Sequence, residues 1–308
     1  MFVLKETFKQ SLKQPQIHRE LCQENIQRFN KTCIITGASR GIGALLAKRL
    51  AKNKYNVVIA AKSVKENLKL PGTIYSVAKE INDAGGIALP VKTDLRSETD
   101  CQNLVDETIL NFGNVDVLIN NAGALWWKPI VETPTKRYDL INDINVRASY
   151  ILSHLCLPYM EKNNFGHIIM QSPPFNPEEV MDLSLKRLLK DKTAYMVSKL
   201  GMSIVSKGIS QEYNDKNICS NTIWPVTPIK THALTNNNIG DDRFYRKPEI
   251  LVDAIELMLE EDPMRFNGRS VYDEDYLREK GVSDFTKYRC HKDFEPPKIK
   301  DVNHLMKN

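Results

Sequence analysis

The sequence predicts a single α/β domain, with one doubly wound (Rossmann-type) parallel sheet and helices on both faces. From residue 31 onward, short apolar runs alternate with segments of helical spacing, and a glycine-rich turn separates the first run from the first helix. Strands that alternate with helices form parallel βαβ units with right-handed crossovers. The runs are continuously apolar, which indicates a sheet that helices cover on both sides.

The predicted strands are apolar runs with many β-branched side chains. "KTCIIT" and "NVVIAA" are the first two, and "GHIIMQS" and "ICSNTIWP" occur later in the chain. Strands are expected at residues 31–36, 56–61, 86–94, 114–121, 166–172, 218–225 and 268–273.

The segments between these strands have helical spacing and recognisable ends. The segment 73–85 closes with glycine, and the segment 97–113 begins with a serine cap and ends at glycine. The stretch 134–163 predicts one long helix. Helices are expected at residues 43–53, 73–85, 97–113, 134–163, 193–214 and 247–261.

The predicted domain spans residues 31–275, between an N-terminal extension at 1–30 and a C-terminal tail at 276–308. In the extension, apolar residues recur every four positions beside lysines, so a short amphipathic basic helix is expected there. A surface helix and a mitochondrial presequence are both open. The tail is charged and shows weak order signals. The segment 173–192 is an insertion with some helical spacing, and 231–247 is polar and loop-like.

Composition argues against several classes of protein. The 308 residues carry a net charge of +5 without a basic block, so no nucleic-acid partner is expected. No run approaches the roughly 20 apolar residues of a membrane span. The six cysteines lie far apart and form no C-x-x-C pair, which favours reduced thiols in an intracellular protein and no metal site.

A dinucleotide site is expected at "TGASRGIG", residues 36–43, between the first strand and the first helix. Its glycines permit a tight turn, close approach to a pyrophosphate and close helix packing, although a merely tight turn stays the alternative. "NNAG", which includes Asn121, ends the fourth strand with small residues that a cofactor can approach.

The type of dinucleotide is predicted from the end of the second strand. Enzymes that use NAD usually place an acid there, whereas this strand is followed by Lys62, and Arg40 lies in the glycine loop. Two cations suit the 2′-phosphate of NADP, unless Lys62 only faces solvent. Asp94 follows the third strand, where it is placed either to contact the adenine region or to cap its own loop.

A reacting centre is expected at Tyr195 and Lys199, which are four residues apart at the start of a helix. A nearby ammonium group favours the phenolate and lowers the tyrosine pKa towards that of a useful acid/base. Ser172 ends the fifth strand, at the sheet edge where such folds bind ligands. Asn145 is an asparagine inside a helix, suited either to bind water or a backbone carbonyl, or simply exposed.

Two further features concern the substrate. Tyr195 follows Ser172 by 23 residues, but both are expected at the carboxyl edge of the sheet, because loop closure costs grow slowly with length. Trp126 and Trp127 follow "NNAG", where they line an apolar substrate site or pack in the core.

Together, "TGASRGIG", "NNAG", Asn145, Ser172 and "YMVSK" resemble the short-chain dehydrogenase/reductase family over residues 30 to 275. Within it, "VIAAKS", "GTIY", "TPTKRYDL", "QSPP" and "WPVTPIKTHA" resemble the hydroxysteroid dehydrogenase-like protein 2 group.

The resemblance implies an NADP-dependent oxidoreductase that acts on a carbonyl or secondary alcohol, with an apolar lipid- or sterol-like substrate. It implies Tyr195 as acid/base, Lys199 as its pKa-lowering partner, Ser172 as carbonyl orienter and Asn145 as proton relay. It also implies a dimer or tetramer, and a peroxisomal or mitochondrial location, with the cytoplasm left open. The expected cofactor contacts are Gly37, Ala38, Ser39, Arg40, Gly41, Ile42, Gly43, Lys62, Asp94, Asn121 and Lys199.

The chain departs from that pattern in three respects. It ends at residue 308, so the lipid-carrier domain of many group members is not expected, and its last residues "MKN" are not a peroxisomal S-K-L address. The gap between Ser172 and Tyr195 is longer than usual in the wider family. A nucleotide-binding scaffold or sensor with little turnover is the rival function, against which the presence of all four catalytic residue types argues.

Overall fold

The computed structural model describes residues 31–298, apart from 68–69, 175–188 and 236–240. The predicted helix in 1–30, most of the insertion 173–192, part of the loop 231–247 and the last ten residues lie outside the described residues. Within the described part, no helix combines the length and the apolarity that a bilayer crossing requires.

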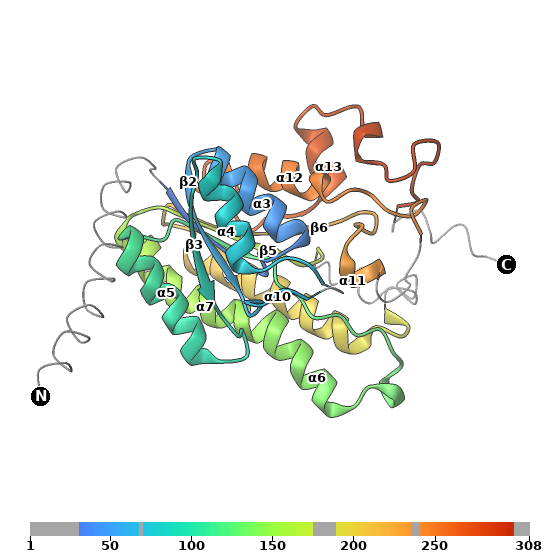
Figure 1. The fold of residues 1–308 in the computed structure, drawn as a ribbon, viewed down its shortest axis with the longest axis horizontal. Helices are drawn as coiled ribbons and strands as arrows, with labels where there is room; N and C mark the ends of the chain where they lie inside the picture. The colour runs from blue at the N-terminus through green and yellow to red at the C-terminus, as the bar shows by residue number, and fades with distance from the viewer. Residues whose placement is uncertain (1–30, 68–69, 175–188, 236–240, 299–308) are drawn as a thin grey trace, which may run out of the picture.

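Seven strands of the described residues form one sheet in the order β3-β2-β1-β4-β5-β6-β7 (Figure 1). Every neighbouring pair is parallel. The strands are β1 Lys31–Thr36, β2 Tyr55–Ala61, β3 Ile87–Lys92, β4 Val117–Asn120, β5 Gly166–Gln171, β6 Ile218–Trp224 and β7 Ser270–Tyr272. The predicted fold class, a single doubly wound parallel sheet, is confirmed.

The strand order changes direction between β1 and β4. The chain builds β2 and β3 on one side of β1, and β4 to β7 on the other. In such sheets the crevice at the carboxyl ends of the two central strands is where ligands bind. The predicted nucleotide loop follows β1 and the "NNAG" segment follows β4, so both lie at this crevice.

Helices cover both faces of the sheet (Figure 1). The side chains of α3, α4 and α12 pack on one face, and those of α5, α7 and α10 on the other. The longer helices are α3 Gly41–Lys52, α4 Ile74–Asp83, α5 Glu98–Phe112, α6 Thr135–Asn142, α7 Ala148–Lys162, α10 Thr193–Glu212 and α12 Glu249–Leu259, and the short ones are α11 His232–Thr235 and α13 Asp273–Glu279.

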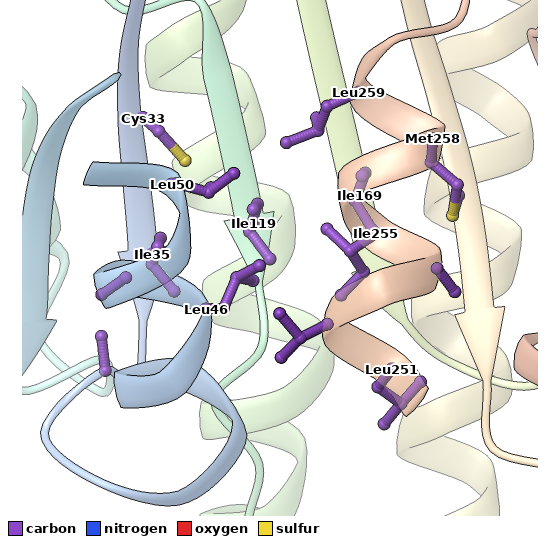
Figure 2. Packing of buried hydrophobic residues seen from close by; sticks show 14 of the residues in the cluster. Cys33, Ile35, Leu46, Leu50, Ile119, Ile169, Leu251, Ile255, Met258 and Leu259 are labelled. Carbon is purple, nitrogen blue, oxygen red and sulfur yellow. The ribbon is translucent and has the colours of Figure 1, made fainter. Parts of the chain in front are cut away.

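The core consists of two layers that the pleat of the strands separates. In β1, Cys33 and Ile35 face α3 and α12, while Ile34 faces the other helices. Figure 2 shows the first layer, in which Leu46 of α3 and Ile255 of α12 lie over the strands. Each fully buried side chain of this size contributes roughly 1.5–3 kcal/mol.

The predicted long helix at 134–163 is three elements. α6 is followed by one turn of π-helix, Asp143–Arg147, and then by α7. Single π turns inside helices occur often at functional sites. This turn carries Asn145, whose side chain is fully buried.

The C-terminal segment is more ordered than the sequence predicts. After α13, Phe285 and Tyr288 are buried in the core layer of α12. The buried Arg246 guanidinium lies 2.7 Å from the buried Glu274 carboxylate and also pairs with Glu295. The expectation of weak order after residue 276 is therefore wrong as far as residue 298, because aromatic side chains and ion pairs tie this charged segment to the domain.

Candidate active site

The glycine-rich loop joins β1 to α3 and is closely fitted against the end of β4. Gly37 has φ +68°, and a Cβ on it would lie 2.9 Å from Ala122 Cα. A Cβ on Gly43 would lie 2.5 Å from Asn121 Nδ2 and 2.7 Å from the Gly37 carbonyl oxygen. A side chain at either position would push the loop away from the strand.

The start of α3 faces open space. Arg40 is the N-cap residue, and its side chain makes no capping hydrogen bond to the helix. Gly41 has φ +56°, and a Cβ built on it would meet no described atom within 4 Å. Open space beside backbone amides at a helix N-terminus suits an anion such as a pyrophosphate. Residues 37–43 therefore fit a dinucleotide cofactor.

A chain of hydrogen bonds runs from this loop along the carboxyl edge of the sheet. Asn121 Nδ2 donates to the Thr36 carbonyl oxygen at 2.7 Å, and Gln171 Nε2 donates to Asn121 Oδ1 at 2.8 Å. Lys199 Nζ then donates to the Gln171 carbonyl oxygen at 2.8 Å. The ends of β1, β4 and β5 thus connect the glycine loop to the lysine of α10.

α10 places Tyr195 and Lys199 one turn apart in a desolvated environment. Burial raises the pKa of the Tyr195 phenol and lowers the pKa of Lys199 to about 7. The predicted lowering of the tyrosine pKa by Lys199 is not found, because Lys199 donates to Gln171 and desolvation disfavours both charged forms. Near pH 7 the Tyr195 phenol is therefore neutral, and Lys199 is divided about equally between its charged and neutral forms.

Asn145 fixes the loop after β4. Its Oδ1 accepts from the Ala124 amide at 2.8 Å, and its Nδ2 donates to the Ala124 carbonyl oxygen at 3.1 Å. Nδ2 also donates to Ser198 Oγ at 2.9 Å, and that hydroxyl donates to the Tyr195 carbonyl oxygen at 2.7 Å. The alternative that Asn145 is merely an exposed polar residue is therefore excluded.

Gly123 lies close to the side chains of both Lys199 and Asn145. A Cβ on Gly123 would lie 3.5 Å from Lys199 Nζ and 3.7 Å from Asn145 Oδ1. The segment after β4 therefore approaches both polar groups, of which Asn145 lies in the π turn and Lys199 in α10.

Ser172 directly follows β5 and is fully buried. Its amide donates to the Ile223 carbonyl oxygen at 3.1 Å, but its Oγ has no hydrogen-bond partner among the described residues. Ser203 Oγ of α10 donates to the Pro173 carbonyl oxygen at 2.6 Å. α10 therefore lies against the end of β5 despite the long connection, as predicted for two residues at one sheet edge.

Two indole rings flank Tyr195. The Trp127 ring lies 6.3 Å from the Tyr195 ring between centroids, at 66°, and the Trp224 ring lies 6.5 Å away at 41°. Trp126 instead lies against Arg137, whose guanidinium carbon is 4.8 Å from its ring centroid. Of the two predicted wall residues, Trp127 is the one in contact with the tyrosine.

The residues predicted to select the dinucleotide lie at the edge of this site. Lys62 is exposed just after β2, and Arg40 Nη2 donates to the Gly72 carbonyl oxygen at 2.8 Å. Asp94 accepts from Arg96 Nε at 2.9 Å, and this hydrogen bond lowers the pKa of Asp94 to about 2. The Asp94 carboxylate thus holds its own loop, one of the two roles that the sequence leaves open.

Sequence reasoning missed three residues of the site: Gln171, Ser198 and Trp224. A polar residue directly before Ser172 and a tryptophan at the end of β6 are visible signals at the carboxyl edge. Ser198 gives no such signal, because its role depends on the π turn that brings Asn145 to α10.

The charge state of Lys199 is expected to appear in the pH dependence of stability. The pKa of about 7 in the folded protein lies below the ordinary value of 10.5. The cost of burying the charge is therefore absent above about pH 10.5, grows as pH falls, and is complete below about pH 7. Relative to wild type, Lys199→Met should gain up to about 1.4 kcal/mol of unfolding free energy per pH unit of decrease in this window.

Thermal or urea unfolding of both proteins at about pH 6 and about pH 9 measures this difference. The lost hydrogen bond to Gln171 affects both pH values equally, so only the change with pH reports on the charge. Lys207→Met, an exposed lysine on the same helix, is the control. If the difference in unfolding free energy between Lys199→Met and wild type were the same at both pH values, the charge on Lys199 would be buried at little cost.

Known proteins share this architecture. Hydroxysteroid dehydrogenase-like protein 2 of Xenopus tropicalis is 41% identical over 258 residues, which cover 83% of this chain and 60% of that protein. The chain thus spans about 60% of the length of this curated relative. A crystal structure of a short chain dehydrogenase from Mycobacterium thermoresistibile is 41% identical with a TM-score of 0.78, and the match covers 87% of this chain and 93% of that one.

Two less similar structures contain dinucleotides. A metagenomic short-chain oxidoreductase in complex with NADP is 25% identical with a TM-score of 0.63, over 79% of this chain and 95% of that one. A 7α-hydroxysteroid dehydrogenase complexed with NADH and 7-oxo glycochenodeoxycholic acid is 26% identical with a TM-score of 0.66, over 81% of this chain and 95% of that one. The family model of short chain dehydrogenases matches residues 31–241. The chain therefore belongs to the short-chain dehydrogenase/reductase family of oxidoreductases.

Proposed function

We propose that this chain transfers hydride between NADP and a carbonyl or secondary alcohol, with Tyr195 as the general acid/base. The observation that carries the proposal is the convergence of Lys199 and Asn145 at Gly123, with Tyr195 one turn from Lys199 and the unpartnered Ser172 hydroxyl at the end of β5. A hydrogen-bond chain joins this centre to the glycine loop.

A dinucleotide held by residues 37–43 and Lys199 would supply the hydride at its nicotinamide ring. The Ser172 and Tyr195 hydroxyls donate hydrogen bonds to the substrate carbonyl oxygen, where negative charge develops. Because burial raises the tyrosine pKa, the phenol stays protonated at neutral pH, which is the form that gives a proton to that oxygen. Lys199, with a pKa of about 7, is suited to return the proton, and Asn145 orders the backbone along this path.

The choice of NADP rests on the residues after β2. Lys62 directly follows this strand in place of the acid that would hold ribose hydroxyls, and Arg40 lies in the loop. Arg40 already donates a hydrogen bond to the Gly72 carbonyl oxygen, and the negative charge of the Glu66 carboxylate offsets part of its positive charge. Lys62 is therefore the stronger candidate for the 2′-phosphate.

The nucleotide assignment is tested by titrating NADPH and NADH against the purified protein. NADPH should bind more tightly, and Lys62→Glu should weaken it at least about tenfold while changing NADH affinity much less. Lys52→Glu, the same charge reversal at the far end of α3, is the matched control. Equal losses for both nucleotides, or tighter binding of NADH by wild type, would contradict the assignment.

A turnover assay, together with this titration, distinguishes the proposed enzyme from a nucleotide-binding scaffold or sensor. Turnover of NADPH with a panel of ketones and aldehydes supports the proposed reaction. Tight NADPH binding without turnover of any carbonyl would favour a nucleotide-binding scaffold or sensor. The indole rings beside Tyr195 support an apolar substrate, since they offer ring faces next to the reacting centre.

A further inference from the structure

The indole N–H of Trp127 lacks a partner beside the reacting tyrosine. Its Nε1 is shielded from water, and among the described residues none accepts a hydrogen bond from it. The Trp127 and Tyr195 rings are inclined at 66° to each other, with their centroids 6.3 Å apart. Buried donors in folded proteins are nearly always paired, so an orphan donor next to a reacting group indicates a partner that the protein itself does not supply.

The donors around Tyr195 outnumber the lone pairs of one carbonyl oxygen. A carbonyl oxygen accepts two hydrogen bonds. In the proposed reaction the Ser172 and Tyr195 hydroxyls use both, and Ser172 Oγ is likewise unpartnered among the described residues. The Trp127 N–H is a third donor, and it needs a second acceptor atom.

Trp127 is held in place rather than free to turn. Lys192 Nζ lies 4.6 Å from the centroid of its ring, on the face of the indole. A cation over this face is attracted by the ring quadrupole and restrains the side chain. Lys192 is three residues before Tyr195, so the same helix start positions both the tyrosine and the indole.

We infer that the substrate carries a second hydrogen-bond acceptor, a carbonyl or ester oxygen a few carbon atoms from the reacting carbonyl, and that Trp127 Nε1 donates to it. This inference rests on the proposed carbonyl reduction and narrows its substrate class to oxo esters and related dicarbonyl compounds. Trp127 is then a specificity-determining residue, because a simple ketone leaves its N–H unpaired.

Two probes of equal size test this assignment. Ethyl acetoacetate carries the second acceptor, and methyl hexyl ketone lacks it. With NADPH, wild type should prefer the ester, and Trp127→Phe should lower kcat/KM for the ester about tenfold while changing the ketone less than about threefold. Trp126→Phe, which removes a neighbouring indole N–H, should leave the ratio between the two probes unchanged. Equal losses for both probes with Trp127→Phe would overturn the inference.

A binding measurement separates this inference from the proposed reaction. The protein has three tryptophans, so the Trp127 indole resonance in the NMR spectrum of ¹⁵N-labelled protein is identified by its loss in Trp127→Phe, or by elimination with the other two. Ethyl acetoacetate, with NADPH present, should shift this resonance downfield, and methyl hexyl ketone should not. A shift without turnover would refute the proposed reaction and keep the acceptor site. Turnover without a shift would refute the acceptor site alone.

Discussion

Tyr195→Phe is expected to lower kcat/KM for carbonyl reduction by about 10²–10⁴-fold and to leave NADPH affinity within about threefold. The phenol hydroxyl is the only part of the residue that the change removes. The ring remains between Trp127 and Trp224, whose centroids lie 6.3 Å and 6.5 Å away, so its packing is retained. The loss should therefore appear in the chemical step, measured by single-turnover kinetics.

Tyr213→Phe is the matched control, because Tyr213 terminates the same helix far from the site. It should leave single-turnover rates unchanged. Ser172→Ala should cause a smaller loss than Tyr195→Phe, because serine only donates a hydrogen bond whereas tyrosine also transfers the proton. If Tyr195→Phe retained most of the wild-type rate, another group would have to supply the proton, and the assignment of Tyr195 would fail.

Arg246→Met is expected to lower the free energy of unfolding by about 3 kcal/mol. Arg246 and Glu274 are both fully buried, and the nearest atoms of their charged groups are 2.7 Å apart. Burial by itself would raise the pKa of Glu274. Hydrogen bonds from Lys298 and Arg278 and the charge of Arg246 outweigh this effect and hold the pKa below its ordinary value, so the carboxylate stays ionised. Removing Arg246 leaves the Glu274 carboxylate with Arg278 and Lys298 as its cationic partners, and these two limit the loss of stability.

Urea unfolding of Arg246→Met beside Arg269→Met measures the effect. Arg269 pairs with Glu279 at 2.9 Å, but both side chains are nearly half exposed, so its loss should cost less than about 1 kcal/mol. Adding Glu274→Leu to Arg246→Met should recover part of the stability, because the stranded charge is then gone. Equal effects of Arg246→Met and Arg269→Met would show that the buried pair contributes no more than a surface pair.

The sequence predicts the sheet well because its strands leave a local signal. A strand buried on both faces must be apolar throughout, and its neighbours in the chain are helices with their own caps. Runs such as 31–36 and 166–172 therefore appear in the structure as β1 and β5, within one residue of the expected ends.

The sequence singles out candidate site residues only where one residue type at a strand or helix end suffices. Tyr195, Lys199 and Ser172 fall into this class, and the structure places them at one edge of the sheet. Gln171 and Ser198 do not, since each acts through a partner that is distant in sequence: Gln171 bonds Asn121, and Ser198 bonds Asn145. Residue spacing along the chain contains no information about such pairs.

The order of residues 276–298 is not predicted from the sequence for a similar reason. Charge and proline beyond residue 276 suggest a solvated tail when each residue is considered alone. Phe285 and Tyr288 are buried only because α12 offers them an apolar surface, and Tyr288 Oη donates to Asp253 of that helix at 2.7 Å.

The ion pairs of Arg246 also determine how much of the chain must be kept together in a fusion or chimera. The matched family region stops at residue 241, yet Arg246 finds its acids at Glu274 and Glu295, and Lys298 completes the cluster. A chimera that replaced the chain after residue 275 would keep Arg246 beside Glu274 but remove Arg278, Glu295 and Lys298, the other partners of this buried pair. A fusion or domain swap with this protein should therefore carry the chain through Lys298, past residue 241 where the match to the family model ends.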